Sequence, residues 1–476
     1  MVGSLDALVA EMTSIVGVDA VRAGELDRHL FSKDAGVTRG EVSVVVLPKT
    51  ARQVAAVVRA AVSHDVAVVP RGAGTGLSGG AVPESPAVLI VTTRMNQIDL
   101  DAGNHQAWVG PGVINLDLSD HTDQFGLYFA PDPSSQAACT IGGNVANNSG
   151  GPHCLAEGST VNHILAVEFV TADGDIVVAG SGAPDPIGLD LRGVMVGSEG
   201  TLGIVTRVLV KLLPKPPAIR TLLLAFPEVA GAAATVSGVI AAGVVPAALE
   251  MMDRPLIRAV ENFVHADLPV DAAAVLLAEV AGHEAGVDAE AELIAQTATE
   301  NGAFQVRRAA DAEERELLWK ARKSAFGAIA QVAPDYYLHD TVVPRTKLVE
   351  VLNQIYEIAA RRNLLVLNTI HAGDGNLHPL FAFDGSDPGM VAQVKAAADE
   401  VVDISIAAGG TLSGEHGIGL EKRDLMHLMF SPVDLDAQAR LREAFDPVGV
   451  MNPAKVLPAG SRCFDFGRPV PEGTWV

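Results

Sequence analysis

Two glycine-framed segments near the end of the chain carry residue types that bind metal ions. The first, HAGDGNLHP, places His371 and His378 on either side of a Gly-Asp-Gly turn, and the second, SGEHGIG, places Glu415 and His416 between glycines. Side chains seven residues apart point to opposite faces of one straight strand, but the turn folds the segment back, so both imidazoles can point to one place. Glycines around Glu415 and His416 permit an unusual backbone that brings both side chains into a confined site.

Two histidines and a carboxylate form a three-ligand set for Zn²⁺ or a similar divalent ion such as Mn²⁺. His371, His378 and Glu415 would leave open positions for a substrate oxygen, which is the arrangement of a catalytic metal site. His416 then remains as a candidate general base, because histidine titrates near neutral pH. The alternative is that these are surface histidines or satisfied core histidines. Four such residues in two glycine-framed turns favour the site.

A third candidate lies in the basic segment Trp319-Lys320-Ala321-Arg322-Lys323-Ser324, which we expect on a helix. Arg322 could hold a carboxylate through two N–H groups. Taken alone, a basic helix turn is more often a solvated face, so this assignment depends on the metal site.

A glycine-rich loop, PRGAGTGLSGG (Pro70–Gly80), follows the apolar run 66–69 and has five glycines from Gly72 onward. Such a loop can direct successive N–H groups to one point and bind a phosphate. We predict that it holds the pyrophosphate of a dinucleotide. The loop contains GxGxxG, but a Rossmann motif needs a helix to begin there, and Pro83 and Pro86 exclude one. A flexible surface loop is the remaining alternative.

The polar stretch from Tyr128 to Gly158, YFAPDPSSQAACTIGGNVANNSGGPHCLAEG, has almost no apolar periodicity. A long polar segment inside a compact domain is usually functional or disordered. Its small buryable residues argue against disorder. We predict a second backbone wall against the cofactor, with hydrogen bonds from Ser135, Thr140, Asn144 and Asn148; an ordinary folded loop is the alternative.

Composition limits the function classes. The chain has 476 residues and a formal net charge of −23, which argues against a nucleic-acid partner. Its three cysteines (Cys139, Cys154 and Cys463) argue against a disulfide framework and exclude an iron–sulfur cluster held by this chain alone. The N-terminal segment lacks the basic region of a signal peptide, and the richest apolar span, 236–252, is interrupted by Gly and Pro and is too short to cross a bilayer. We expect a cytoplasmic protein; a peripheral position at the inner face of a membrane stays open.

The elements that must position these residues suggest an α+β fold with two domains. A strand over 42–47, a helix capped by Thr50 and a strand over 66–69 open the cofactor domain. From residue 220 short strands and helices alternate to about residue 408, and 420–446 is helical again. We expect an N-terminal helical segment (1–36), a cofactor domain (37–216), a second domain with the metal site (217–422) and C-terminal helices and tail (423–476).

These stretches together resemble the FAD-linked oxidase family typified by the glycolate oxidase flavoprotein subunit, D-lactate dehydrogenase and D-2-hydroxyglutarate dehydrogenase. The matching segments are PRGAGTGLSGGA, PDPSSQAACTIGGNVANNSGG, GSEGTLGIVT, WKARKSAFG, PDYY, HAGDGNLHP, GGTLSGEHGIG and DPVGVMNPAK. The resemblance implies the fold of the vanillyl-alcohol-oxidase superfamily. This fold has a PCMH-type FAD-binding domain and an α+β substrate or cap domain with an antiparallel sheet, and the tail returns to the FAD domain.

The resemblance also implies site residues. The pyrophosphate would be held by Arg71, Gly72, Ala73, Gly74, Thr75, Gly76 and Leu77. Adenosine and flavin would be lined by Pro131, Ser135, Thr140, Gly143, Asn144, Asn148, Glu199, Gly200 and Ile204, and Asn452 would touch the flavin from the tail. Because the glycine loop has no histidine for a covalent link, we expect non-covalent FAD.

In the family, residues matching His371, His378 and Glu415 bind a divalent metal, and the residue matching His416 acts as a base. The implied mechanism has the metal and Arg322 hold an α-hydroxy-carboxylate while His416 takes the hydroxyl proton and a hydride passes to flavin N5. The product would be a 2-oxo acid.

Apolar residues at Phe326 and Leu380, where the dicarboxylate-specific branch has polar ones, favour D-lactate or glycolate over D-2-hydroxyglutarate. An alkyl transferase of the same fold and a catalytically silent FAD-binding subunit of a larger complex are the alternatives. The electron acceptor (quinone, cytochrome, electron-transfer flavoprotein or iron–sulfur subunit) stays open, as does a homodimer.

Overall fold

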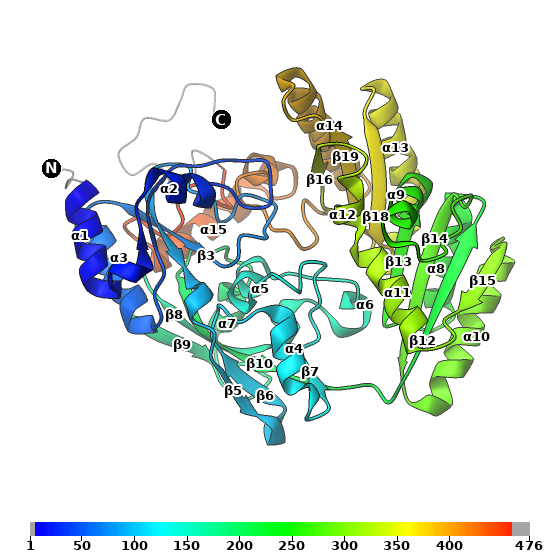
Figure 1. The fold of residues 1–476 in the computed structure, drawn as a ribbon, viewed down its shortest axis with the longest axis horizontal. Helices are drawn as coiled ribbons and strands as arrows, with labels where there is room; N and C mark the ends of the chain where they lie inside the picture. Colours follow the sequence, from blue (N-terminus) through cyan, green and yellow to red (C-terminus); the bar gives the residue numbers. More distant parts are fainter. Residues whose placement is uncertain (1–4, 459–476) are drawn as a thin grey trace. The chain divides into compact units, whose positions relative to one another are not determined.

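The computed structural model describes residues 5–458, which form two compact units (Figure 1). Within these residues the first unit comprises 5–150, 159–215 and 415–458, and the second comprises 151–158 and 216–414. The chain thus enters the second unit briefly at 151–158, again at 216, and leaves it after Gly414. The domain boundaries expected at 216/217 and 422/423 stay a prediction, and Cys463 lies outside the described residues.

The first sheet of the first unit has the order β1-β2-β4-β3. Its strands are β1 (Val21–Arg22), β2 (Val42–Val46), β4 (Ala87–Val91) and β3 (Ala67–Arg71). The β2–β4 and β4–β3 pairs are parallel. Helix α3 (Ala51–Ser63) connects β2 to β3 as predicted, and the Thr50 hydroxyl accepts a hydrogen bond from the Gln53 amide at its start. β4, which the sequence interpretation did not identify, lies between β2 and β3.

The second sheet of this unit is antiparallel, with the order β5-β6-β10-β8-β9. Its strands are β5 (Ile98–Asp101), β6 (Gln106–Val109), β10 (Ile204–Lys211), β8 (Ile164–Val170) and β9 (Ile176–Gly180). Two short strands, β7 (Leu127–Tyr128) and β11 (Leu213–Pro214), form a separate antiparallel pair. The helices of the unit are α1 (Leu5–Val16), α2 (Glu25–Phe31), α4 (Asn115–Asp123), α5 (Ile141–Asn147), α7 (Leu191–Met195) and α15 (Pro432–Phe445).

The structure adds detail to one sequence expectation and corrects another. The stretch 128–158, predicted as a polar backbone wall or a folded loop, contains the short helices α5, where Thr140 is the N-cap, and α6 (Cys154–Glu157). The helix expected over 420–446 is a 3₁₀ turn, η6 (Arg423–Leu428), followed by α15. The second helix starts separately because Ser431 and Asp434 form a capping box ahead of Pro432.

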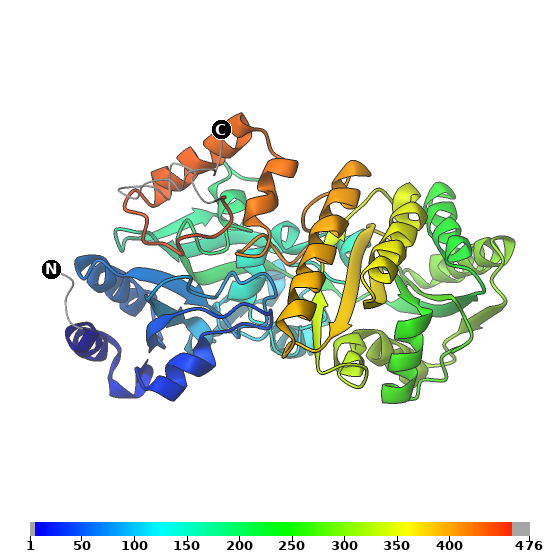
Figure 2. The same cartoon turned by 90° about the horizontal axis from the view of Figure 1, so that it is seen from above.

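The second unit is built on one antiparallel sheet with the order β15-β12-β14-β13-β18-β19-β16, and β17 pairs with β19. Its strands are β12 (Ala218–Phe226), β13 (Ala248–Asp253), β14 (Ala274–Gly282), β15 (Gln305–Arg308), β16 (Asp335–Leu338), β17 (Thr341–Val342), β18 (Leu365–His371) and β19 (Asn376–Phe383). One face packs on α8 (Val229–Ala241), α10 (Glu284–Glu300), α13 (Leu348–Arg361) and α14 (Pro388–Ala407). In Figure 2, α8, α13 and α14 (green to orange) run side by side over this face.

The other face of this sheet carries polar residues. Leu249, Met251, Ile370 and Leu377 belong to the apolar core. Because neighbouring side chains on a strand point to opposite faces, Glu250, His371 and His378 point away from that core. This second face is covered by α9 (Arg254–Val264), against which α11 (Ala312–Lys323) and α12 (Ala325–Ile329) pack. The sheet therefore places the ionisable residues on the side that holds Arg322 of α11.

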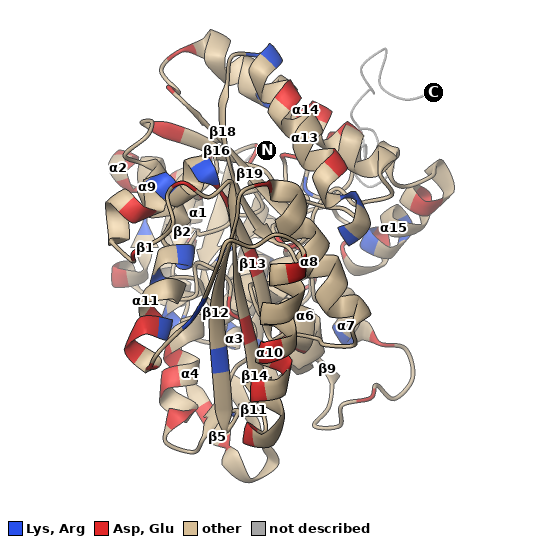
Figure 3. Ribbon diagram, turned by 90° about the vertical axis from the view of Figure 1, so that its right-hand side faces the viewer, with Lys and Arg blue, Asp and Glu red and all other residues tan. Residues whose placement is uncertain are grey.

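Acidic residues recur along the helices of the second unit, and Figure 3 shows them in red on α10. This helix carries Glu284, Asp288, Glu290, Glu292 and Glu300 and no basic residue.

Within residues 5–458, no helix has both the length and the apolar character needed to cross a bilayer.

Candidate FAD and metal site

The glycine loop of the first unit begins where β3 ends at Arg71, and no helix follows before β4. The prediction that this GxGxxG does not start a Rossmann helix is confirmed. Gly74 has a φ of 77°, a conformation that residues with a Cβ rarely adopt, and a Cβ there would lie 2.0 Å from Arg71 Nη2. A Cβ on Gly72 would lie 2.3 Å from the Thr140 hydroxyl. The loop therefore needs glycine at both positions, and the Arg71 guanidinium folds back over Gly74.

The polar stretch after β7 is braced by its own side chains. The Thr140 hydroxyl accepts from the Gly143 amide (3.4 Å), and the Asn144 side chain bonds to Asn115 (3.0 Å) and Ser149 (2.9 Å). Asn148 Oδ1 accepts from the Val161 amide at 2.9 Å.

These bonds hold the backbone of 140–148 in place within the first unit. Ser135 adds a backbone bond, since its carbonyl accepts from the Ala138 and Cys139 amides, and the Pro131 carbonyl accepts from Asn115. A role of this wall toward a cofactor stays a prediction.

The turn at Glu199 and Gly200, just before Ile204 begins β10, joins the glycine loop to the tail. Asn452 donates from its side-chain amide to the carbonyls of Gly80 (2.8 Å) and Glu199 (2.6 Å). A Cβ on Gly200 would lie 2.3 Å from Cγ of Pro70. The tail is thus tied to both loops expected to line the flavin.

The Glu199 carboxylate is fully buried and accepts hydrogen bonds from the amides of Ile418 (2.7 Å) and Gly419 (2.8 Å). Burial raises the pKa of Glu199 to about 7, and the two amide donors only partly oppose this rise. Its side chain therefore anchors the segment after His416, rather than lining an open surface.

Around the glycine loop and the tail, the buried atoms Arg71 Nη1, Asn452 Oδ1 and Lys455 Nζ find no hydrogen-bond partner among the described residues. Burial lowers the pKa of Lys455 to about 8. Buried polar groups normally have partners, so donors and acceptors left over around the glycine loop and tail fit an extended polar ligand such as FAD. The sequence interpretation missed Lys455, although it ends the matching segment DPVGVMNPAK.

The two histidines of the second unit lie on a hairpin formed by β18 and β19. His371 ends β18, and His378 is paired in register with Thr369, two residues earlier on the same face. The ring centroids are 5.0 Å apart and nearly perpendicular (87°), and each ring offers a nitrogen within 4.8 Å of the other. Both side chains are buried. The turn between them therefore brings the rings together.

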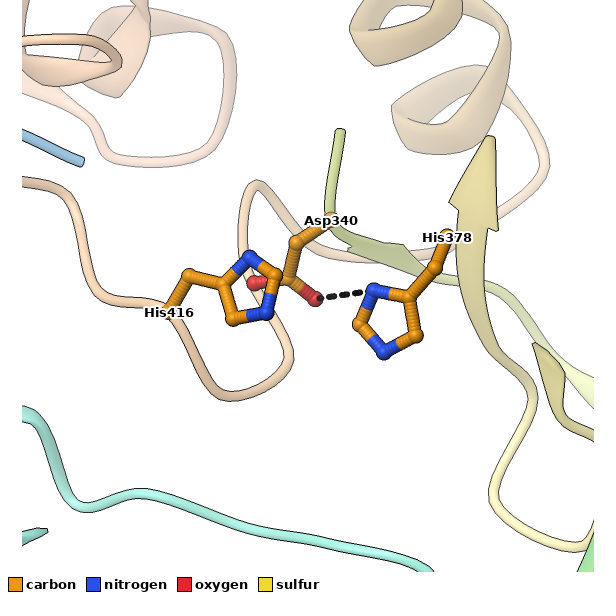
Figure 4. Close-up of side chains that lie close together, drawn as sticks. All are labelled: Asp340, His378 and His416. Atoms are coloured by element: carbon orange, nitrogen blue, oxygen red, sulfur yellow. Dashed lines mark ion pairs between the residues drawn. The ribbon is translucent and has the colours of Figure 1, made fainter. Parts of the chain in front are cut away.

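Each imidazole faces an acceptor through Nδ1. His371 Nδ1 lies 2.8 and 2.9 Å from the carboxylate oxygens of Glu250, which stands opposite it in the register of β13 and β18. His378 Nδ1 lies 3.4 Å from the His339 carbonyl and 4.0 Å from Asp340 Oδ1 (Figure 4). Carboxylate and carbonyl oxygens only accept hydrogen bonds, so each ring in its neutral form carries its proton on Nδ1 and presents the Nε2 lone pair. This is the tautomer that binds a metal ion through Nε2.

Arg322 completes this cluster. It is 1% exposed, and its Nη2 lies 2.5 Å from Oε2 of Glu250. Within the described residues its Nε makes no hydrogen bond. The predicted helix over 319–324 is present as the end of α11.

Glu415 and His416 lie where the chain passes from the second unit to the first. On one side, the Gly414 amide donates to both oxygens of Asp340 (3.0 Å each). On the other side, Ser78 donates to the His416 carbonyl (2.9 Å). His416 Nε2 is 3.8 Å from Oε1 of Glu415. Their roles as base and metal ligand stay predictions.

The sequence interpretation missed two carboxylates of this cluster, Glu250 and Asp340. An acidic residue inside the otherwise apolar run 247–252 is the signal that could have identified Glu250, because a buried carboxylate needs a partner.

Comparison with known proteins adds to this geometry. Residues 215–456 match the family described as FAD linked oxidases, C-terminal domain, and residues 42–180 match the FAD binding domain family. The chain is 46% identical to glycolate oxidase subunit GlcD of Escherichia coli (strain K12), over 89% of this chain and 85% of the relative. It is 39% identical to the Bacillus subtilis GlcD subunit (95% and 97% covered) and 32% identical to D-lactate dehydrogenase of Anaerostipes hadrus (92% and 94%).

Solved structures show the same fold. The 4-ethylphenol oxidase from Gulosibacter chungangensis superposes with a TM-score of 0.81 at 16% identity, covering 95% of this chain and 97% of that one. The expected two-domain PCMH-type fold and the resemblance are therefore confirmed. Its sequence matches and its fold agree: the chain belongs to the FAD-linked oxidase family and is an FAD-dependent oxidoreductase.

Proposed function

We propose that this protein oxidises a short D-2-hydroxy acid, D-lactate or glycolate, to the 2-oxo acid. The observation that carries the proposal is the buried cluster of the second unit, in which Arg322 contacts Glu250, Glu250 contacts His371, and the His371 ring lies against that of His378. A guanidinium beside two metal-competent imidazoles suits a substrate with a carboxylate adjacent to a hydroxyl. The names of the relatives, glycolate oxidase subunit and D-lactate dehydrogenase, support the same substrate class.

The metal ligands in this proposal are His371, His378 and Glu415. Glu250 and Asp340 are buried carboxylates beside the histidines, Glu415 is a third carboxylate, and Arg322 is the cation that contacts Glu250, so the carboxylates outnumber this cation. This excess of negative charge would be stabilised by a divalent cation bound between the two imidazole rings. A bound Zn²⁺ or Mn²⁺ would supply Lewis-acid polarisation of the substrate hydroxyl.

The other roles belong to the chain's own groups. Arg322 holds the substrate carboxylate through its N–H groups, while Glu250 fixes the orientation of the guanidinium. His416 accepts the hydroxyl proton at a ring nitrogen. The loop 71–77 and the walls 131–148 and 199–204 would hold FAD non-covalently, and the flavin would supply the hydride acceptor.

The preference for a monocarboxylate rests on the same sheet face. Leu380 is fully buried and shares the strand face of His378, and Phe326 stacks on Tyr336 with centroids 6.3 Å apart. A second carboxylate against such residues would be buried without a partner, at a cost of several kcal/mol by order of magnitude. We therefore rank D-2-hydroxyglutarate below D-lactate and glycolate. Since two relatives are named as subunits, a protein electron acceptor is part of the proposal.

A substrate panel tests the proposal. Turnover with a dye as electron acceptor is measured for glycolate, D-lactate, L-lactate and D-2-hydroxyglutarate, before and after chelator treatment. We expect activity with glycolate or D-lactate that the chelator removes and Zn²⁺ or Mn²⁺ restores. Equal rates with both lactate isomers, or chelator-resistant turnover, would contradict the proposed site.

A further inference from the structure

Glu250 is a buried carboxylate that touches two functional side chains at once. It is 1% exposed and lies on β13, in a strand whose neighbouring residues belong to the apolar core. Its two oxygens lie 2.8 and 2.9 Å from His371 Nδ1, and Oε2 lies 2.5 Å from Arg322 Nη2. Burying a carboxylate among apolar residues is costly unless both oxygens have polar partners, and both oxygens of Glu250 have them.

The contact with His371 decides which ring nitrogen carries the proton. A carboxylate accepts hydrogen bonds and donates none, so Nδ1 is the donor, and in the neutral ring Nε2 keeps the lone pair. Register explains why this pairing is reliable: Glu250 and His371 are directly opposite on neighbouring antiparallel strands. The ring can neither flip nor change tautomer without losing its hydrogen bond to the Glu250 carboxylate.

The contact with Arg322 orients the second group. Its guanidinium is as buried as the carboxylate, and its Nε bonds to none of the described residues. Glu250 contacts the guanidinium at Nη2, so other N–H donors of Arg322 remain for an anion. One carboxylate thus fixes both a metal-type ligand and a carboxylate-binding cation.

We propose that Glu250 is a positioning residue that sets the His371 tautomer for metal binding and at the same time orients Arg322 for the substrate carboxylate. This inference rests on the proposed function, because it takes His371 as a metal ligand. The group that binds at His371 Nε2 is a divalent cation, and the group that binds at Arg322 is the carboxylate of the hydroxy acid.

The chain offers a matched control in Glu279 on the next strand, β14. It is equally buried, and its carboxylate accepts from Arg315 Nε and Nη2 and from Trp319 Nε1 and lies 3.4 Å from His153 Nε2. None of these contacts involves His371 or Arg322. Glu279→Gln therefore perturbs a buried carboxylate with cationic and imidazole partners, but outside the proposed cluster.

The experiment compares wild type, E250Q and E279Q as FAD-loaded full-length protein from which metal has been removed. Zn²⁺ and Mn²⁺ dissociation constants are measured by competition with a chelating dye. We expect E250Q to bind either ion about 10 to 100 times more weakly, and E279Q to stay within about threefold of wild type. In steady state, E250Q should also raise KM for the hydroxy acid by about tenfold or more, because Arg322 loses its partner.

E250Q that retains FAD and binds metal within threefold of wild type would overturn the inference. A wild type that binds no divalent ion would overturn both this inference and the proposed metal site, so the two failures are distinct. If E250Q does not fold, the tautomer itself is read in wild type from ¹⁵N-histidine spectra, with His371 assigned through H371Q. A proton on Nδ1 supports the inference, and a proton on Nε2 contradicts it.

Discussion

The buried Glu199 predicts a specific pH dependence of stability. Burial raises its pKa from 4.5 to about 7 even though Ile418 and Gly419 donate to the carboxylate. Since the folded-state pKa lies above the unfolded one, the contribution of this group to stability is complete below about pH 4.5 and is lost as pH rises through about 7. A shift of this size corresponds to about 3.4 kcal/mol, of which about 2.5 kcal/mol falls between about pH 5 and about pH 8.

Glu199→Gln imitates the protonated carboxyl and removes this dependence. We compare the free energy of unfolding of the FAD-free variant with that of FAD-free wild type. The variant minus wild-type difference should increase by about 2.5 kcal/mol from pH 5 to pH 8, because only wild type loses stability as pH rises. Urea unfolding followed by far-UV circular dichroism measures it. Glu84→Gln is the control: the ion pair with Arg423 holds the pKa of Glu84 below its usual range, so its window lies at more acidic pH. A difference between wild type and E199Q that is the same at both pH values would refute the reasoning.

Three further predictions concern the cofactor, the substrate and the metal. Gly74→Ala should lower FAD occupancy, since its Cβ would displace Arg71, whereas Gly188→Ala, with a similar positive φ (82°) and no neighbour within 4 Å, should keep it; flavin absorbance per chain decides. Arg322→Lys should raise KM for the hydroxy acid by roughly 10 to 100-fold through loss of the bidentate bond, and an unchanged KM would contradict that role. Chelation should abolish turnover without releasing FAD, and loss of flavin with the metal would show that the two sites depend on each other.

Local patterns in the sequence were enough to predict the loops. The β2–α3–β3 opening, the glycine loop without a following helix, and the bend between His371 and His378 each depend on residues close together in the chain. Glycine positions and β-branched runs encode such features directly.

Features that depend on pairing between residues far apart in the chain could not be predicted from the sequence. Strand β4 enters between β2 and β3, an order that only tertiary packing decides. Glu250 meets His371 because β13 and β18 are neighbours in the sheet, although 121 residues separate the two side chains. No local pattern contains that register, so Glu250 and Asp340 could not be linked to the histidines from the sequence.

Anaerobic flavin reduction tests the central claim most directly, because it isolates substrate oxidation from the electron acceptor. Metal-loaded and metal-stripped protein are mixed with D-lactate or glycolate, and the flavin absorbance at about 450 nm is followed. The account predicts bleaching in the loaded protein, bleaching slowed by at least about 100-fold after stripping, and recovery with Zn²⁺ or Mn²⁺. No bleaching by any 2-hydroxy acid with metal present, or full-rate bleaching without metal, would contradict it.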